Sequence, residues 1–511
     1  MYTDSIDDLP QSLHRAAGVR ELDRIAIEDA GIPGFTLMRR AGRAAFRLLQ
    51  ASWPEAGRIA VLCGSGNNGG DGCIVAAEAA RRGLEVELYL MAPRERLRGA
   101  AAAALDAALE AGVTPRPWQG GPLQADVVVD ALLGTGLSGA VRDDYRQAID
   151  AINRSAAPVL AIDIPSGLCS DTGTVLGAAV TAARTLSFIG MKLGLLTGDG
   201  RSCAGRVHFD DLQVPGAVLA QVAAVCRRLD GGDLGAALPP RPRSAHKGSY
   251  GHVLVAGGDH GMGGAGVLAA LAAARCGAGL VSLATRPGHV AAAMARAPEV
   301  MSHAVSSGQE LQPLLARPTT LVVGPGLGRA PWGEQLLFHA RASGKPLVVD
   351  ADGLNLLAAA GLQRPEGAGP WVLTPHPGEA ARLLGASVAE VQRDRLAAVR
   401  ELSRRSGATV VLKGSGTLID DGSGTPALCP YGNPGMATGG MGDVLSGVIG
   451  ALLAQGHTPL RAAELGVLLH ALAADRAAAE GERGMLAGDL LPWLRRLVNP
   501  GAAADAPGLD G

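Results

Sequence analysis

Apolar and polar positions in the first half of the chain follow two alternating patterns. Segments with apolar residues three or four apart predict helices, and short apolar runs between turn residues predict buried strands. The expected helices cover 19–30, 35–51, 71–82, 100–111 and 144–153, and the expected strands cover 58–63, 86–90, 126–132, 159–164 and 184–188. Strands that alternate with helices predict a mostly parallel sheet covered on both faces.

The same alternation returns in the second half. Strands are expected at 279–284, 320–323, 346–350, 371–374 and 409–413. The apolar stretch 265–283 has the length of a membrane span, but it contains Arg275 and several glycines and continues into a strand pattern. We expect a buried helix followed by a buried strand there.

A break in composition separates the two halves. It covers 225–247 and contains Leu238-Pro-Pro-Arg-Pro-Arg, and proline favours an extended connector. We therefore expect two α/β domains of similar size over 1–225 and 247–499, a linker over 226–246, and a flexible tail over 500–511.

Composition and charge narrow the classes of function. The 511 residues are 47% hydrophobic with a net charge of -2, which argues against nucleic acid as the main partner. The 7 cysteines show no CxxC spacing, so a disulfide framework or a zinc site is disfavoured. The acidic first residues lack the apolar run of a signal peptide. We expect a cytoplasmic protein without a membrane partner, and a homo-oligomer.

Two glycine-rich motifs each follow a predicted strand of the first domain. They are Gly64-Ser-Gly-Asn-Asn-Gly69 and Gly134-Thr-Gly-Leu-Ser-Gly139. Two such motifs in one domain favour a dinucleotide or phosphate site at the carboxyl edge of the sheet. The acid that usually binds a ribose is missing, because the next strand ends in Tyr89-Leu-Met-Ala-Pro. An ordinary NAD-dependent dehydrogenase is therefore disfavoured.

Oxygen-bearing side chains gather near the same predicted strand ends: Asn68, Asp130, Asp163 and Ser166. Such ligands suit a hard cation or a sugar hydroxyl. Each aspartate alone is explained as well by a cap on a βα loop. As a set, the four favour a binding site.

The run Gly66-Asn-Asn-Gly-Gly-Asp-Gly, with Asp130, the second glycine motif and Asp163-Ile-Pro-Ser-Gly, resembles the NAD(P)H-hydrate epimerase domain over 19–212. That family interconverts the R and S forms of NADH or NADPH hydrated at C6 of the nicotinamide ring. The resemblance implies a Rossmann-like three-layer αβα fold, acid–base work by Asp163, and K⁺ held by Asn68, Asp130 and Ser166. It implies hydrate contacts from Asn67, Asn68, Gly69, Gly70, Asp71, Gly134, Thr135, Gly136, Leu137, Ser138, Gly139, Ala140 and Asp163.

The glycine-rich stretch 433–447 dominates the second domain. Its glycines allow backbone N–H groups to approach an anion, and the apolar run 444–453 behind it reads as a buried helix. A helix N-terminus favours phosphate. Asp443 lies at the junction, where a carboxylate either caps the helix or acts as a base beside a bound phosphate.

Other candidate residues follow the strands of this domain. Gly324 and Gly326 allow close approach of the backbone to a ligand, and Lys413 leads into a glycine turn that suits a nucleotide phosphate. His376 and Glu379 are spaced to face one side of a starting helix.

Together with 247–258 and 350–355, these motifs resemble the ADP- or ATP-dependent NAD(P)H-hydrate dehydratases, a branch of the ribokinase-like superfamily, over 247–497. The resemblance implies a ribokinase-like αβα fold and phosphorylation of the C6 hydroxyl of the S hydrate, with Asp443 as base and Mg²⁺ beside the nucleotide. It implies hydrate contacts from Ala265, Gly326, His376 and Asp443, nucleotide contacts from Lys413, Gly414, Ser415, Gly416, Thr417 and Gly442, and an Mg²⁺-organising role for Glu379.

The two resemblances predict a fused enzyme whose epimerase supplies S hydrate to the dehydratase. One alternative is a ribokinase-like small-molecule kinase with a nucleotide-sensing first domain, which would release a stable phosphorylated product. Another is a first domain that binds dinucleotide without catalysis. The choices between ADP and ATP, and between NADHX and NADPHX, stay open, as does the mechanism of epimerisation.

Overall fold

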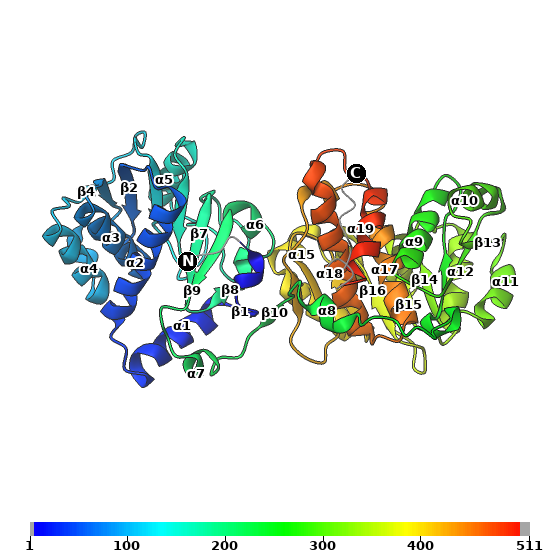
Figure 1. The fold of residues 1–511 in the computed structure, drawn as a ribbon. Coiled ribbons are helices and arrows are strands. Elements are labelled where there is room, and N and C mark those ends of the chain that lie inside the picture. Colours follow the sequence, from blue (N-terminus) through cyan, green and yellow to red (C-terminus); the bar gives the residue numbers. More distant parts are fainter. Residues whose placement is uncertain (1–4, 501–511) are drawn as a thin grey trace. The chain divides into compact units, whose positions relative to one another are not determined.

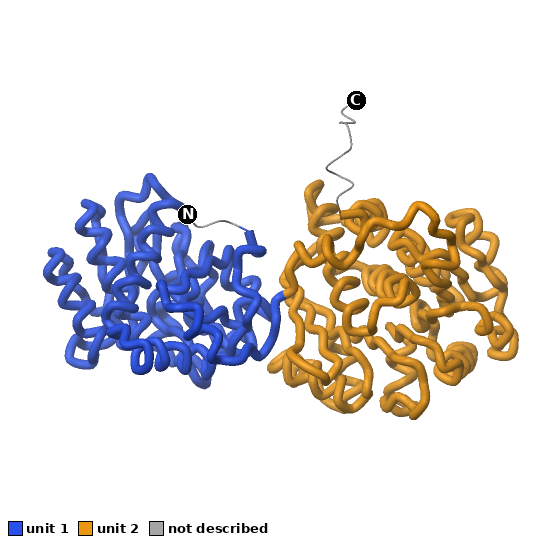
Figure 2. Tube along the Cα trace, turned by 60° about the horizontal axis from the view of Figure 1, so that its bottom comes forward, with its two compact units in different colours: residues 1–228 blue, residues 229–511 orange. Residues whose placement is uncertain are grey.

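A computed structural model describes residues 5–500 and divides the chain into two compact units, with the boundary between Arg228 and Leu229 (Figures 1 and 2). Both units are α/β, as predicted. The expected linker carries strand β10 (Cys226–Arg228) and helix α8 (Asp233–Ala237). Leu229 and Leu234 are 1% and 4% exposed in the core of the second unit. The expected tail lies outside the described residues, apart from residue 500.

The first unit is built on a parallel sheet of 7 strands in the order β4-β3-β2-β5-β6-β7-β9. The strands are β2 (Arg58–Cys63), β3 (Glu85–Leu90), β4 (Arg116–Pro117), β5 (Val127–Ala131), β6 (Val159–Ile162), β7 (Arg184–Phe188) and β9 (Arg206–Asp210). The direction of winding reverses between β2 and β5, and ligands of open α/β sheets bind at such a switch point. Both glycine motifs follow these two strands.

Alternate residues of β2 decide which helices cover which face. Ile59 and Val61 share a core with helices α2 (Gly34–Ser52), α3 (Asn67–Arg81) and α4 (Gly99–Glu110). Ala60 and Leu62 share another core with α5 (Asp143–Arg154). The predicted helix over 71–82 begins four residues earlier, because the glycine motif itself forms the first turn of α3.

Shorter elements of this unit have too weak a pattern to be predicted. Strand β1 (Ser12–His14) pairs in parallel with β8 (Met191–Lys192) and antiparallel with β10. The predicted helix over 19–30 is α1 (Ala16–Arg24) followed by a π-helical turn at Ile25–Asp29. Helices α6 (Gly200–Cys203) and α7 (Gly216–Leu219) follow later in the chain.

The sheet of the second unit runs in the order β13-β12-β11-β14-β15-β16-β17-β18-β19. The strands are β11 (His252–Ala256), β12 (Leu280–Thr285), β13 (Met301–Ala304), β14 (Thr320–Val323), β15 (Leu347–Val349), β16 (Trp371–Leu373), β17 (Thr409–Leu412), β18 (Thr417–Asp420) and β19 (Ala427–Cys429). Neighbours are parallel up to β17, and β18 and β19 are antiparallel. The winding reverses between β11 and β14, which again places a switch point beside glycine turns.

One core of this unit joins the sheet to α9 (Gly263–Arg275), α17 (Met441–Ala454), α18 (Pro459–Ala477) and α19 (Leu490–Leu497). The connections between strands supply α10 (Val290–Arg296), α11 (Gly308–Leu311), α12 (Pro331–Ala342), α13 (Ala351–Ala360), α14 (Pro377–Leu384), α15 (Val388–Arg393) and α16 (Arg395–Ser406). The prediction of a buried helix and strand over 265–283 is confirmed by α9 and β12. Within residues 5–500, no helix combines the length and apolar character needed to cross a membrane.

Candidate functional sites

A cavity of about 720 Å³ lies at the switch point of the first unit. Its wall includes the first turn of α3, the loop 132–142 and the ends of β6 and β7. Ten predicted hydrate-binding residues line it: Asn67, Asn68, Asp71, Gly134, Thr135, Gly136, Leu137, Ser138, Ala140 and Asp163. Gly69, Gly70 and Gly139 are not on this wall.

Two glycines bring the loops of this cavity together. A Cβ at Gly64 would lie 2.0 Å from the carbonyl oxygen of Leu132, and one at Gly69 would lie 1.9 Å from the carbonyl oxygen of Gly64. Both distances exclude a side chain. Gly69 therefore serves the packing of α3 against the strand end.

The predicted cation ligands lie at the strand ends below the cavity. Asp130 is fully buried and accepts hydrogen bonds from the N–H of Ser166 (2.8 Å), the hydroxyl of Ser166 (2.6 Å) and the N–H of Leu132 (3.2 Å). Burial raises the pKa of Asp130 to about 6, although these hydrogen bonds lower it. The amide of Asn68 is buried with neither its nitrogen nor its oxygen hydrogen-bonded. A buried amide without a hydrogen-bond partner among residues 5–500 fits a ligand, or a cation that prefers oxygen atoms.

Asp163 is held in a strained turn at the end of β6. Its φ is +68°, and the N–H of Ile164 donates to the carbonyl oxygen of Ile162 at 2.8 Å. The end of neighbouring β7 repeats this geometry, since Ile189 has φ +60° and the N–H of Gly190 donates to Phe188 O at 2.6 Å. Such classic γ-turns are rare, and backbone strain of this kind, about 1–3 kcal/mol each, concentrates at functional sites.

Two further acids face this end of the cavity. Burial raises the pKa of Asp23 to about 6, with Lys192 opposing the shift and Asp163 adding to it. Burial, followed by the charges of Asp163 and Asp23, raises the pKa of Asp71 well above its ordinary value. The cavity wall therefore includes two carboxyl groups, those of Asp23 and Asp71, whose pKa values are raised above their ordinary values.

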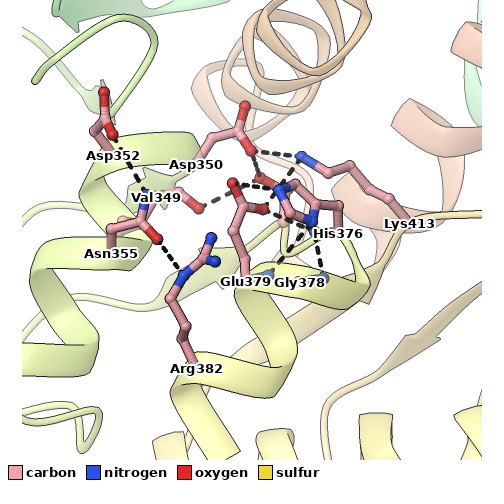
Figure 3. A network of polar contacts seen from close by, with 10 residues as sticks. Val349, Asp350, Asp352, Asn355, His376, Gly378, Glu379, Arg382 and Lys413 are labelled. Carbon is pink, nitrogen blue, oxygen red and sulfur yellow. Dashed lines mark hydrogen bonds and ion pairs between the residues drawn. The ribbon is translucent and has the colours of Figure 1, made fainter. Parts of the chain in front are cut away.

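The second unit gathers a polar network where β15, β16 and β17 end (Figure 3). The ammonium of Lys413 donates to Asp350 Oδ1 at 2.8 Å and lies 3.8 Å from Glu379 Oε2. The hydroxyl of Thr374 donates to the same Asp350 oxygen at 2.8 Å. Burial lowers the pKa of Lys413, but Asp350 and Glu379 outweigh it and the net shift is upward. The lysine therefore stays charged at the centre of the network.

The spacing of His376 and Glu379 is that of a capping box at the start of α14. His376 Nδ1 accepts from Gly378 N (2.9 Å) and Glu379 N (3.3 Å), while Glu379 Oε2 accepts from His376 N (2.8 Å). A reciprocal cap explains the sequence pattern by itself. It also fixes Glu379 beside Lys413, and burial raises the pKa of Glu379 to about 7.

Asp443 lies in the first turn of α17, and the helix begins at Met441 rather than after Asp443. Gly440, with φ +92°, is the N-cap residue, and no side chain makes a capping hydrogen bond. The interpretation of Asp443 as a helix cap is therefore wrong. Burial, followed by the charge of Asp350, raises the pKa of Asp443 to about 7, and Lys413 opposes this. A carboxylate with a pKa near 7 suits a general base at neutral pH.

Glycines draw the other predicted residues close to this network. A Cβ at Gly442 would lie 3.2 Å from Lys413 Nζ and 3.3 Å from Asp350 Oδ2. Gly326, with φ +55°, packs so that a Cβ would lie 3.0 Å from the Cβ of Ala265. The structure thus brings together the residues predicted to meet hydrate and nucleotide.

A buried arginine supports the predicted nucleotide turn from behind. Arg395 is 2% exposed, and its Nη2 donates to the carbonyl oxygens of Leu412 (3.3 Å), Lys413 (3.2 Å) and Gly416 (3.4 Å). A trans peptide points its N–H away from its C=O, so the N–H of Gly414 is directed away from Arg395. The arginine therefore orients one face of the turn that includes 413–417.

Three of these residues were given no role by the sequence analysis. Asp350 is 1% exposed and directly follows a buried strand. Asp163 has the same position after its strand, so the sequence signal that singled out Asp163 applies to Asp350 as well. Lys192 is the one charged residue in the apolar run 188–196, which is a signal for a buried cation. Arg395 lies on a helix with three further arginines, and nothing in its local pattern distinguishes it from them.

Comparison with known proteins identifies both units. A family model described as NAD(P)H-hydrate dehydratase matches residues 253–496, and one described as YjeF-related protein N-terminus matches residues 34–194. A Bacillus subtilis structure, described as an ADP/ATP-dependent NAD(P)H-hydrate dehydratase co-crystallised with ATP/Mg²⁺, is 31% identical, with a TM-score of 0.48. It covers 52% of this chain and 95% of that one.

Relatives that span both units carry a single description, bifunctional NAD(P)H-hydrate repair enzyme Nnr. The protein from Coxiella burnetii is 50% identical over 490 residues, which cover 96% of this chain and 99% of that protein. The protein from Escherichia coli is 43% identical over 96% of this chain and 95% of its own length. With identity of this extent across both units, the chain belongs to the family of bifunctional NAD(P)H-hydrate repair enzymes.

Proposed function

We propose that the second unit dehydrates the S form of hydrated NADH or NADPH at the expense of ADP or ATP. Asp443 takes the proton of the C6 hydroxyl as that oxygen attacks the terminal phosphorus of the nucleotide. The C6–O bond then breaks and a proton leaves C5, so the C5–C6 double bond forms and inorganic phosphate departs in place of hydroxide, which is a poor leaving group. The observation that carries this proposal is the position of Asp443, which faces Lys413 and Asp350 at a helix N-terminus without capping it.

The residues around Asp443 suit the two substrates. Lys413 and the N–H groups of the turn up to Thr417 meet the nucleotide phosphates, with Gly442 beside them, and their positive charge stabilises the transferring phosphoryl group. Ala265, Gly326 and half-exposed His376 contact the hydrate. The residues of this site fit Mg²⁺ bound mainly by phosphate oxygens, because no cluster of three or more His, Cys, Asp or Glu side chains suited to a metal exists among residues 5–500. Bound there with Glu379, Mg²⁺ supplies charge neutralisation.

For the first unit, we propose interconversion of the R and S hydrates in the cavity at the switch point. Asp163 serves as the group that takes and returns a proton while a bond at C6 is broken and remade. Asn68, Asp130 and Ser166 fit K⁺, because Asn68 has an unpaired buried amide and Asp130 is a buried carboxylate. K⁺ supplies a fixed positive charge beside the substrate. Cytoplasmic location and homo-oligomerisation stay predictions.

The absorbance of a mixture of R and S NADHX tests both activities in one cuvette. With ADP or ATP, S is consumed first, R follows at the rate of epimerisation, and NADH and inorganic phosphate appear in equal amounts. Without nucleotide, no NADH forms. A stable phosphorylated product would instead identify a small-molecule kinase, and R that is never consumed would identify a first unit that binds without catalysis.

Asp130→Ala separates the two sites. It removes the acceptor of three hydrogen bonds, which costs roughly 1–3 kcal/mol of stability for each buried donor left unpaired. We expect weaker hydrate binding and slower epimerisation, with dehydration of pure S hydrate unchanged. Equal loss of both activities would contradict the assignment of two independent sites.

A further inference from the structure

Lys192 contacts Asp163, which lines the cavity of the first unit, and is itself fully buried. A lysine has three N–H donors, and this ammonium has three acceptors. It donates to Asp163 Oδ1, to Ser187 Oγ at 3.1 Å and to the carbonyl oxygen of Phe188 at 3.1 Å. With every donor occupied, Lys192 is held in one position.

The bond to Lys192 leaves the two oxygens of Asp163 in different surroundings. Oδ1 binds the ammonium, whereas Oδ2 lies on the side of Gly134, 3.6 Å from where a Cβ of that glycine would be. The same point is 3.5 Å from Cγ of Asn68, whose buried amide has no hydrogen-bond partner among residues 5–500. One carboxylate oxygen and one unpaired amide therefore converge beside the glycine loop that lines the cavity.

Backbone turns fix the positions of both Asp163 and Lys192. Asp163 and Ile189 occupy the two γ-turns at the ends of neighbouring strands β6 and β7, and Ile189 leads directly into β8, which carries Lys192. Both turn residues line the cavity. Two strained turns placed side by side indicate a geometry held for function rather than for packing.

We propose that Lys192 is a positioning residue for epimerisation, which holds Oδ1 of Asp163 and presents its Oδ2 to the substrate. This rests on the proposed function of the first unit. Asp163 accepts the proton of the C6 hydroxyl as the C6–N1 bond of the ring breaks, with C6=O forming and the electron pair of the broken bond moving to N1 and its conjugated carboxamide. The proton returns to oxygen when N1 forms the bond again on the other face of C6, so no proton or electron is consumed. Lys192 itself does not touch the substrate.

The charges around this pair make the lysine necessary. Asp23 on α1 and Asp71 on α3 face Asp163 with like charge, and His14 on β1 faces Lys192. An opposite charge at hydrogen-bonding distance favours the ionised form of a carboxyl group, and like charges oppose it. Without the ammonium, Asp163 would lose its partner of opposite charge, while the two other acids would remain beside it.

The test measures the rate of R-NADHX consumption by the full chain with ATP from pH 5 to 9, after the wild-type chain has been shown to epimerise. In Lys192→Met and Lys192→Gln we expect the acidic limb of kcat to move up by about one to two pH units. At neutral pH, kcat should fall by at least about tenfold, with KM unchanged. Lys192→Gln is one atom shorter but retains N–H donors, so it keeps the test open where the methionine variant does not fold.

Ser187→Ala is the matched control, because it removes another hydrogen bond of Lys192 and leaves the Lys192–Asp163 pair in place. Its acidic limb should stay at the wild-type pH. A lower rate with an unmoved limb in the Lys192 variants would assign the lysine a merely structural role and overturn the inference. A wild-type chain without epimerase activity would instead refute the proposed function itself, so the two failures are distinguishable.

Discussion

At the level of single residues, the two possible roles of Asp443, helix cap and general base, can be separated most clearly. It follows the capping glycine of α17 by three residues and makes no capping hydrogen bond. Its neighbours are charged groups of the site, Lys413 and Asp350. Its side chain does not cap the helix, which supports the proposed role of a base.

Asp443→Asn keeps shape and hydrogen bonding but cannot accept the hydroxyl proton. We expect dehydratase turnover to fall at least about a hundredfold, because loss of a positioned base typically costs 10²–10⁴-fold. Epimerase rate and nucleotide affinity should be unchanged, as measured by steady-state kinetics and calorimetry. Asp421→Asn, the same change in the turn between β18 and β19, is the control. Near-wild-type dehydration by Asp443→Asn would refute the assignment.

The pH dependence of dehydration follows from the raised pKa of Asp443, about 7. The base must be ionised to act, so kcat should increase as the pH rises through about 7 and should be low at more acidic pH. Burial also raises the pKa of Glu379 to about 7, so Glu379→Gln is needed to assign the limb. If the limb belongs to Asp443, the glutamine variant keeps it at the same pH. Its disappearance in that variant would transfer the titration to Glu379.

At the level of elements, the turns that follow the strands are shaped by residues behind them. Arg395 at the start of α16 bonds three carbonyl oxygens in the turn between β17 and β18. A Cβ at Gly414 would lie 2.9 Å from its Nη1. The guanidinium and the glycine are therefore matched to each other, and the turn depends on both.

Arg395→Lys tests this support, because an ammonium cannot reproduce the planar fork of a guanidinium. We expect KM for ADP or ATP to rise about tenfold or more, an effect of roughly 1.4 kcal/mol or more, with kcat less affected and epimerisation unchanged. The control is Arg404→Lys on the exposed face of the same helix. Within residues 5–500, Arg404 bonds only Glu401, so this variant should leave KM at the wild-type value. An unchanged KM in Arg395→Lys would show that the turn orients itself.

At the level of the whole molecule, the two compact units predict separable activities. Each has its own core and switch point, and Leu229 and Leu234 pack in the core of the second unit. The proline-rich stretch after them is therefore not where the second unit begins. Its folding requires the residues that precede the prolines.

We expect fragment 1–228 to epimerise and fragment 229–511 to dehydrate S hydrate with ADP or ATP. Fragment 239–511 lacks two buried leucines, each worth roughly 1.5–3 kcal/mol, and should unfold at markedly lower denaturant concentration than fragment 229–511. Urea unfolding followed by circular dichroism measures this difference. Equal midpoints would place the boundary at the prolines, and an insoluble 229–511 beside a soluble full chain would show that the units are not separable.

The sequence by itself determined the alternation of strands and helices, the two domains and the glycine motifs at the strand ends. These features are local: apolar period, turn residues and glycine spacing are written in consecutive residues. The residues that meet at each switch point followed from one rule, since the carboxyl ends of parallel strands share an edge. Asp130, Asp163 and Lys413 were predicted in this way, and Asp443 was predicted from the glycine-rich stretch that precedes a helix.

Only the tertiary structure decided what neighbours those residues have. Lys192 and Arg395 contact residues that are distant in the sequence. Both are buried, and a buried charge indicates a specific structural or functional role. The spacing of His376 and Glu379 suggested a site, while the fold showed a capping box that also positions the glutamate. Asp443 does not cap α17, because the helix begins three residues earlier than the apolar run indicates. Capping, pKa and strain depend on three-dimensional packing, and no local pattern encodes them.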